Sequence, residues 1–386
     1  MPVVKNYSCE NCGAVLGNIN SVSGQCEYCG TAFTVESIRN CQEIFSNEGV
    51  TSGVPFNAQP QTLYKYVRDF LTSNPAAPSD VLESARITSC KCVCLPAYYY
   101  CYTGESAFTC QTANNVKRTV NDSSGNSRTV TDTNWTPFGG NVYATVEGIV
   151  SGNSDYDNVI DNMYKDYHIN TLVDAESLEI PATIEVVKFT RPANELLGKY
   201  IRPNVEESCV RMAKGQLQGM DGYRNLSVIP GKITKERDEK LIMGIYNVNV
   251  EYNGNNYPMY ISGDGNKVIY QSSSPVDAQK ETALNSLKKV LADADSALSS
   301  NKTLTTVAFI AAVICFLFMP VALKIIGGIG GIAGGVFLMV KKKPLLQAAR
   351  DEADNNLNNF NNTQQEVFRS FDANGSIIQG HELLGI

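Results

Sequence analysis

"LIMGIYNVNVEYNGNNYPMYISGDGNKVIYQ", residues 241–271, carries the clearest fold signal in the chain. Apolar and polar residues alternate in three runs, which is the period of a half-buried β-strand. An Asn-Gly pair at 253–254 separates the first two runs, and such a pair between alternating runs is a strong hairpin signal. A Gly-Asp-Gly triplet at 263–265 separates the second run from the third. The stretch therefore predicts a three-stranded meander.

The residues before this meander are also rich in strand formers. ITSCKCVCLPAYYYCY, residues 87–102, alternates, whereas residues 112–134 are rich in Ser, Thr and Asn and predict a long hairpin tip or loop. Residues 194–218 have a partly helical pattern. Together these segments predict an α+β domain, rich in strands, over residues 84–275.

Cysteines in this domain allow two interpretations. Cys90, Cys92 and Cys94 alternate, so they share one face of a strand, with Cys101 and Cys110 on following segments. A second metal site is one interpretation. Packing is the favoured one, because a reduced cysteine behaves as a small hydrophobic residue. The tyrosines at 98–102 are likewise expected to pack within the sheet rather than to stack nucleic-acid bases.

The N-terminal stretch SCENCGAVLGNINSVSGQCEYCG, residues 8–30, contains two copies of the pattern C-E-x-C-G. Paired CxxC motifs are typical of metal sites, and four thiolates suit a tetrahedral Zn²⁺. Iron fits the same geometry, but zinc is favoured because nothing nearby suggests electron transfer; four unconnected buried cysteines are the other alternative. The glycine after each pair permits a tight turn with positive φ. The predicted ligands of one structural zinc ion per chain are Cys9, Cys12, Cys26 and Cys29.

A closed four-cysteine site leaves no position for a substrate, so the sequence predicts no catalytic or cofactor-binding residue there. Zinc would fold residues 1–40, which are too few to build a core alone. Residues 41–83 are predicted to form a linker followed by a helix at 62–71, which ends before Pro75.

The charge and composition of the chain limit the classes of partner that it is expected to bind. The chain has 386 residues, a net charge of −7 and only two histidines, His168 and His381. Binding to the phosphate backbone of nucleic acid needs clustered Lys and Arg, so nucleic acid is not expected as a partner, and a protein partner is expected instead. No secretory signal precedes the first cysteine pair, which predicts reduced thiols and a cytoplasmic ribbon.

An apolar region near the C-terminal end predicts a membrane anchor. Residues 304–323 carry no charge and are long enough to span a bilayer, and residues 325–340 form a second apolar run with glycines every four positions. The prediction is a transmembrane hairpin over residues 303–341, with homo-oligomerisation through its glycine-rich helix. Lysines outside the spans place both termini in the cytoplasm.

Helical patterns of equal length flank this region. Residues 276–302 and 344–371 both repeat apolar positions at three and four residues, the second within a helical tail at 342–386. Such flanks are expected of an antiparallel coiled coil that continues out of the membrane. The predicted fold class is therefore α+β: a zinc ribbon, a β-rich middle domain and a transmembrane hairpin flanked by a coiled coil.

Four segments resemble a group of bacterial and phage zinc-ribbon membrane proteins, labelled TFIIB-type zinc ribbon or primosomal-protein-N′-like. They are the ribbon, CLPAYYYCYTGE at 94–105, the meander at 246–270 and the apolar region. The resemblance implies an architecture and no known reaction. The helicase-related label depends on the ribbon alone, since the chain lacks a G-x-x-x-x-G-K-[ST] loop.

These features together favour a non-enzymatic, membrane-anchored adapter or scaffold that faces the cytoplasm. The alternative is a nucleic-acid-associated zinc-ribbon factor tethered to the membrane. A third class is a hydrolase or transferase whose site lies in the β-rich domain.

Overall fold

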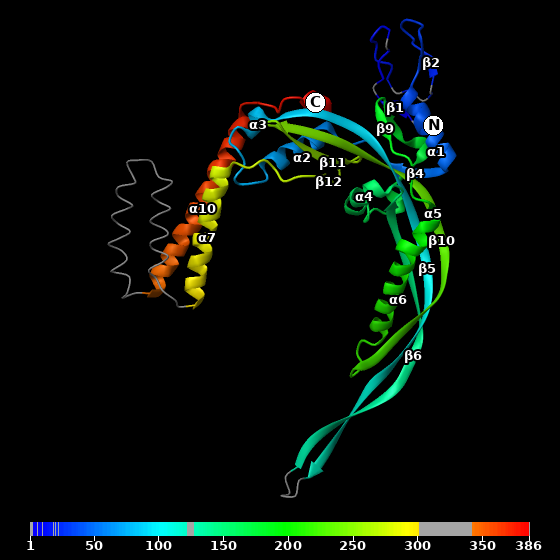
Figure 1. The fold of residues 1–386 in the computed structure, drawn as a ribbon, viewed down its shortest axis with the longest axis vertical. Coiled ribbons are helices and arrows are strands. Elements are labelled where there is room, and N and C mark those ends of the chain that lie inside the picture. The colour runs from blue at the N-terminus through cyan, green and yellow to red at the C-terminus, as the bar shows by residue number, and fades with distance from the viewer. Residues whose placement is uncertain are drawn as a thin grey trace. The chain divides into compact units, whose positions relative to one another are not determined.

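The computed structural model describes residues 3–5, 7–9, 11–17, 19, 21, 23–121, 127–300 and 342–385. The chain forms two compact units, each assembled from segments that are distant in sequence (Figure 1). Unit 1 consists of Met1–Ala58, Lys91–Asn247 and Tyr260–Ile269, and unit 2 of Gln59–Cys90, Val248–Met259 and Tyr270–Ile386.

Helices and strands alternate irregularly along the chain. The strands are β1 (Val3–Lys5), β2 (Ser23–Gln25), β3 (Ala32–Thr34), β4 (Val50–Val54), β5 (Arg86–Asn121), β6 (Ser127–Ser151), β7 (Val173–Asp174), β8 (Glu179–Pro181), β9 (Ile184–Val186), β10 (Tyr223–Tyr252), β11 (Asn255–Ser262) and β12 (Val268–Tyr270). The α-helices are α1 (Glu36–Glu48), α2 (Pro60–Thr72), α3 (Val81–Ser84), α4 (Asp157–Met163), α5 (Ala193–Leu196), α6 (Arg202–Gln216), α7 (Ala278–Ser300) and α10 (Lys342–Ala373). Short 3₁₀ or π turns are η1 (Ser154–Tyr156), η2 (Ile169–Thr171), η3 (Ala175–Ser177), η4 (Leu197–Ile201) and η5 (His381–Leu384).

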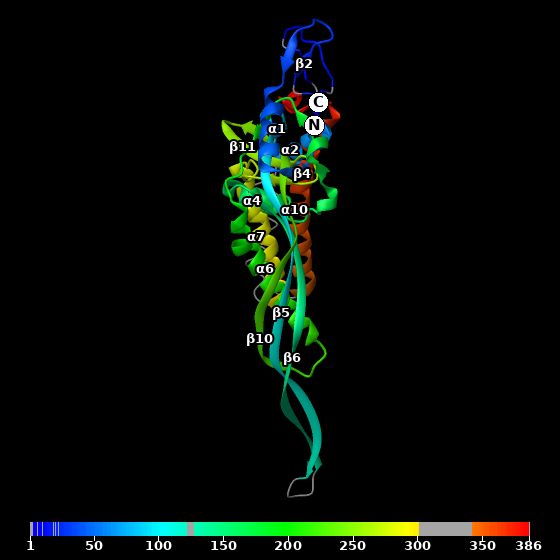
Figure 2. The ribbon, with the colours of Figure 1, turned by 90° about the vertical axis from the view of Figure 1, so that its right-hand side faces the viewer.

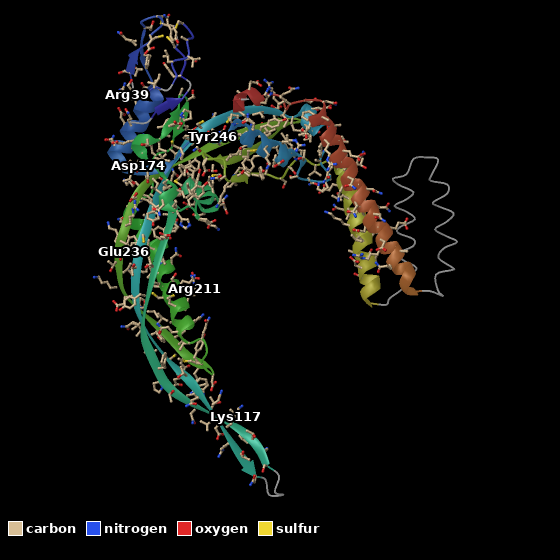
Figure 3. The ribbon with its side chains drawn as sticks, turned by 180° about the vertical axis from the view of Figure 1, so that it is seen from behind. Arg39, Lys117, Asp174, Arg211, Glu236 and Tyr246 are labelled. Atoms are coloured by element: carbon tan, nitrogen blue, oxygen red, sulfur yellow. The ribbon has the colours of Figure 1, made fainter. Side chains whose placement is uncertain are left out.

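The main sheet has eight strands, and its longest pairing is the antiparallel hairpin of β5 and β6. The register runs without a shift from Ala97 opposite Ser151 to Asn121 opposite Ser127. At a rise of about 3.4 Å per residue, 25 residues of β6 extend about 80 Å. Residues 112–121 and 127–134, predicted as a hairpin tip or loop, are therefore strand, and Lys117 lies on this distal part (Figure 3).

Alternation along β5 and β6 gives unit 1 a separate core on each face of the hairpin. Residues at even positions, including Tyr98, Tyr100 and Phe108, pack with α6, which lies along the hairpin (Figure 2). Residues at odd positions, including Leu95 and Tyr99, pack with α4. The tyrosines at 98–100 are buried, which confirms that they pack within the sheet.

Gly104 allows α6 to approach the sheet closely. A Cβ atom at this position would lie 2.0 Å from Cγ1 of Val205, so any side chain would displace the helix.

We expect Gly104→Ala to destabilise the protein by about 1–3 kcal/mol in urea unfolding. The control is Gly215→Ala within α6, where a Cβ meets nothing within 4 Å. That substitution is expected to be neutral or stabilising by up to about 1 kcal/mol. Equal destabilisation by both changes would show that close packing at Gly104 is unimportant.

The meander predicted at residues 241–271 is confirmed as β10, β11 and β12, although β12 is shorter than its pattern. Asn253 and Gly254 join β10 to β11 with φ values of 51° and 75°. Positive φ at both central residues is the requirement of a tight type I′ hairpin turn, which Asn and Gly meet at least cost. The helix predicted in residues 194–218 is also present, as α5, η4 and α6.

In unit 2, α7 and α10 pack side by side in antiparallel orientation (Figure 1). Leu287, Val290 and Ala353 form their shared core. The Arg350 guanidinium lies 2.8 Å from Asp295 near one end of the pair. Toward the other end, the Lys280 ammonium donates to Gln364 over 2.6 Å. The predicted pairing of the two flanking helices is thus present, whereas its description as a coiled coil remains a prediction.

The predicted fold class was wrong in its membrane part, as was the two-span membrane localisation with cytoplasmic termini. Within the described ranges, no helix is both long enough and apolar enough to cross a bilayer. The long helices α7 and α10 carry charges along their length, and their narrow apolar stripe is used for packing against each other. The predicted spans at 303–341 lie outside the described residues. The observed fold is instead mixed helix and strand, built around a large sheet with extensive antiparallel pairing.

Candidate metal centre

The four cysteines predicted as metal ligands come together in unit 1. The Sγ atoms of Cys9, Cys12, Cys26 and Cys29 all lie within 4.8 Å of one another. The Sγ–Sγ distance is 3.7 Å between Cys9 and Cys29, and it is also 3.7 Å between Cys12 and Cys26. Four sulfurs placed tetrahedrally at about 2.3 Å from a central ion would be about 3.8 Å apart. The cluster therefore has the size and the ligand chemistry to hold a metal ion.

The backbone repeats itself around the two cysteine pairs. The Cys9 amide donates to the Ala14 carbonyl over 2.9 Å, and the Gly13 amide to the Cys9 carbonyl over 2.8 Å. The second pair has the same two bonds, from Cys26 to Thr31 and from Gly30 to Cys26, at the same lengths. The φ values of Gly13 and Gly30 are 72° and 69°. The glycine after each pair therefore has the positive φ that the sequence predicts, and it closes a tight turn around the sulfurs.

Among the described residues of this ribbon, little apolar packing is present. Ile19 and Val35 form its buried cluster, with Tyr7 and Phe33 packed against them. The antiparallel pair of β2 and β3 provides three residue pairs, and β1 joins the ribbon to β8 in parallel. So small a core contributes little stability, which makes the cysteine cluster the main candidate for holding the fold of the ribbon.

Exposure differs among the four thiols, and the pKa values of Cys12 and Cys29 are shifted in opposite directions. Cys9 and Cys26 are 3% and 2% exposed, whereas Cys12 and Cys29 are exposed. Hydrogen bonds from the Thr31 hydroxyl and backbone lower the pKa of Cys29 to about 6. The Ala14 amide favours the Cys12 thiolate, but the neighbouring thiols outweigh it and raise the pKa of Cys12 to about 12. Proximity to other sulfurs thus opposes simultaneous ionisation, which a bound cation would offset.

Two residues beside the cluster were not predicted from the sequence. The Asn11 amide donates to Cys29 Sγ over 3.7 Å and to Thr31 Oγ1 over 3.0 Å. Thr31 Oγ1 lies 3.2 Å from the same sulfur. Hydrogen bonds of this kind orient metal ligands. The sequence indicated these two residues only by their positions, because Asn11 lies within the first cysteine pair and Thr31 closely follows the second pair.

The second metal site, considered at Cys90, Cys92 and Cys94, is not assembled. Among the residues that the structure describes, the N-terminal four form the only cluster of at least three potential ligands. Cys94 is buried, and burial raises the pKa of Cys90 to about 11. These properties agree with the favoured interpretation that the alternating cysteines pack as small side chains.

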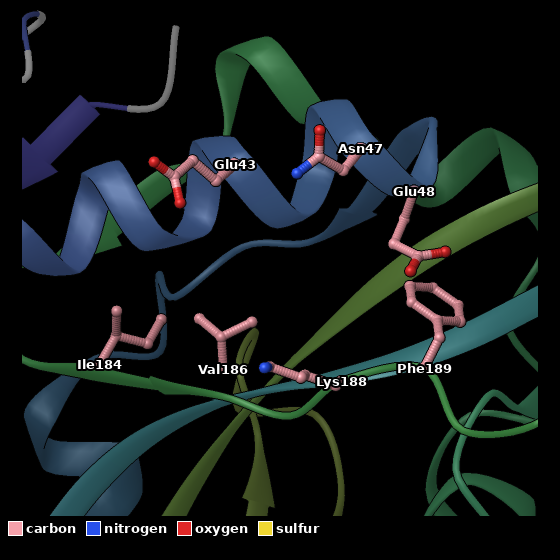
Figure 4. A pocket seen from close by; sticks show the side chains of 7 residues that line it. All are labelled: Glu43, Asn47, Glu48, Ile184, Val186, Lys188 and Phe189. Carbon is pink, nitrogen blue, oxygen red and sulfur yellow. The ribbon is translucent and has the colours of Figure 1, made fainter.

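A groove of about 610 Å³ lies between α1 and the segment that contains β9 (Figure 4). Ile184 and Val186 form its apolar side, and Glu43 and Glu48 line the helix side. Glu48 is already paired with Lys240 over 2.6 Å, and Glu43 lies 3.7 Å from Arg39. The two carboxylates already have basic partners, and Lys188 adds a positive charge to the same groove, so its mixed charge favours no class of ligand.

No protein-family model matches the chain, and neither a curated protein nor a solved structure matches it. The resemblance to zinc-ribbon proteins therefore remains a prediction.

Proposed function

We propose that the chain is a zinc-ribbon adapter or scaffold, without enzymatic activity, that binds another protein. The observation that supports zinc is the arrangement of four thiols at tetrahedral spacing within two equivalent backbone turns. Four cysteine ligands fill the coordination sphere of Zn²⁺, so the ion would stabilise the ribbon and activate no water. Its role would be to present the surface of the ribbon.

The exposed side chains around the cluster favour a protein partner. Tyr28 lies between Cys26 and Cys29, and this residue is 74% exposed. Val15 follows the first turn and is 63% exposed. Residues 1–40 contain two basic residues and three acidic ones, before the charge of any thiolate is added. Exposed aromatic residues are enriched at protein interfaces, whereas nucleic-acid surfaces are basic.

The second candidate is a nucleic-acid-associated factor, because zinc ribbons and aromatic side chains also occur in proteins of that class. Filter binding of the full chain to DNA and RNA at about 50 and 200 mM salt separates the two candidates. We expect weak binding with little salt dependence, because the net charge is −7. Tight binding that falls by about 10³-fold or more between the two salt concentrations would contradict the adapter proposal and favour the second candidate.

A further inference from the structure

Unit 2 contains a second hollow, of about 460 Å³, beside the rings of Phe70 and Tyr270. Ser272, Ser273 and Ser274, which follow β12, and Lys288 on α7 form other parts of its wall. Sites for small molecules typically occupy about 300–1,000 Å³. The hollow is therefore large enough for a compact ligand, and its wall combines an aromatic surface with polar groups.

The aromatic part of the wall is held in place from one side. Phe70 is buried, and its ring stacks on Tyr270 with centroids 4.9 Å apart and planes inclined by 29°. The Tyr270 hydroxyl also donates to the Tyr66 carbonyl over 3.4 Å. Tyr270 nevertheless remains 38% exposed. A fixed ring that still has exposed surface is suited to stacking against a planar group of a ligand.

The polar part of the wall suits an anion. The Lys288 ammonium and the three serine hydroxyls have no ion-pair or hydrogen-bond partner within the described part of the chain. None of the described residues that line the hollow is acidic, although the chain as a whole has a net charge of −7. Hydroxyl and ammonium donors are the groups that bind phosphate oxygens, and ionised partners make the stronger hydrogen bonds.

We propose that this hollow binds a nucleoside monophosphate or a similar phosphomonoester that carries a planar ring. The phosphate lies against Lys288 and the hydroxyls of residues 272–274, and the ring stacks on Tyr270. This binding is independent of the four-cysteine cluster, because all the described residues that line the hollow belong to unit 2 and the four cysteines belong to unit 1.

Calorimetric titration of the full chain with AMP, adenosine, ribose 5-phosphate and inorganic phosphate tests the proposal. We expect AMP to bind at least tenfold more tightly than each of the others, because only AMP engages both parts of the wall. Absence of saturable AMP binding would overturn the proposal. Ribose 5-phosphate or inorganic phosphate that binds as tightly as AMP would overturn the stacking role of Tyr270.

Matched variants locate the site. Lys288→Glu is expected to weaken AMP binding at least tenfold, whereas Lys289→Glu makes the same charge change at the next position, outside the lining, and should leave it unchanged. Tyr270→Ala should weaken AMP at least tenfold and inorganic phosphate by less than twofold. Equal losses from Lys288→Glu and Lys289→Glu would show general electrostatic attraction and contradict a defined site. Circular dichroism and thermal unfolding, measured on each variant, confirm that the chain is folded.

Discussion

On the proposal that the four cysteines bind zinc, removal of that ion by a chelator is expected to unfold the ribbon, residues 7–35, while the rest of unit 1 stays folded. Structural zinc sites in small peptides contribute about 10–16 kcal/mol at neutral pH, and the apolar cluster of Ile19 and Val35 is too small to replace that contribution. Hydrogen–deuterium exchange should rise at least 100-fold in ribbon amides. Peptides from the centre of β10 should exchange at an unchanged rate, because that strand belongs to a separate core.

Cysteine variants provide the matched control for this result. Cys26→Ser removes one of the two buried ligands and should produce the same local unfolding without a chelator. Cys101→Ser changes a half-buried cysteine of the sheet that is outside the cluster, and ribbon exchange should be unaffected. Ribbon amides that remain protected after both chelation and Cys26→Ser would show that the ribbon folds without a metal.

Asp157→Ala is expected to destabilise unit 1 by about 3–5 kcal/mol, because it leaves a buried guanidinium without its counter-charge. The Arg191 side chain is only 3% exposed, and its two terminal nitrogens each donate to one Asp157 oxygen over 2.8 Å. Arg191 also donates to the Ser151 carbonyl over 2.6 Å, so it joins the end of β6 to the start of α4. The Asp157 partner raises the pKa of Arg191, which keeps the guanidinium charged.

Urea unfolding measures this effect. Asp155→Ala, two positions earlier and exposed, is the matched control and should change the free energy of unfolding by no more than about 0.5 kcal/mol. The double variant Arg191→Met with Asp157→Leu removes both charges together and should recover much of the loss. A cost below about 1 kcal/mol for Asp157→Ala would mean that water reaches the guanidinium in the folded protein.

Local signals in the sequence were sufficient for some elements. Asn253-Gly254 specifies its turn because these two residue types tolerate the required positive φ, and the same reasoning identified Gly13 and Gly30. Paired CxxC motifs located the four clustered thiols for a similar reason, since each turn that closes around its sulfurs involves only a few consecutive residues. The pattern in residues 62–71 likewise identified α2, which needs only neighbours along one helix.

Other features depend on partners that are distant in the sequence. Helix α1 crosses the predicted boundary between the ribbon, residues 1–40, and the linker that follows it. The start of this helix has no side-chain cap, so the sequence carried no capping signal for it. The polar residues 112–121 become strand because β6 pairs with them throughout, although their composition is typical of a loop. Most strands of the main sheet lie between Phe70 and Tyr270 in the sequence. No pattern of neighbouring residues could therefore predict that these two rings stack. Hydropathy predicted a membrane anchor at residues 303–341, which lie outside the described residues, and no described helix is long and apolar enough to cross a bilayer.

We expect one structural zinc ion to be bound by Cys9, Cys12, Cys26 and Cys29, and X-ray absorption at the zinc edge tests this binding most directly. The full chain, purified without chelators and analysed for metal in parallel, should contain about one zinc per chain, coordinated by four sulfurs at about 2.3 Å. Cys26→Ser should lose the metal or replace one sulfur by a lighter atom, and Cys101→Ser should match the unmodified chain. Protein without zinc, or zinc bound mainly by nitrogen and oxygen, would contradict the assignment.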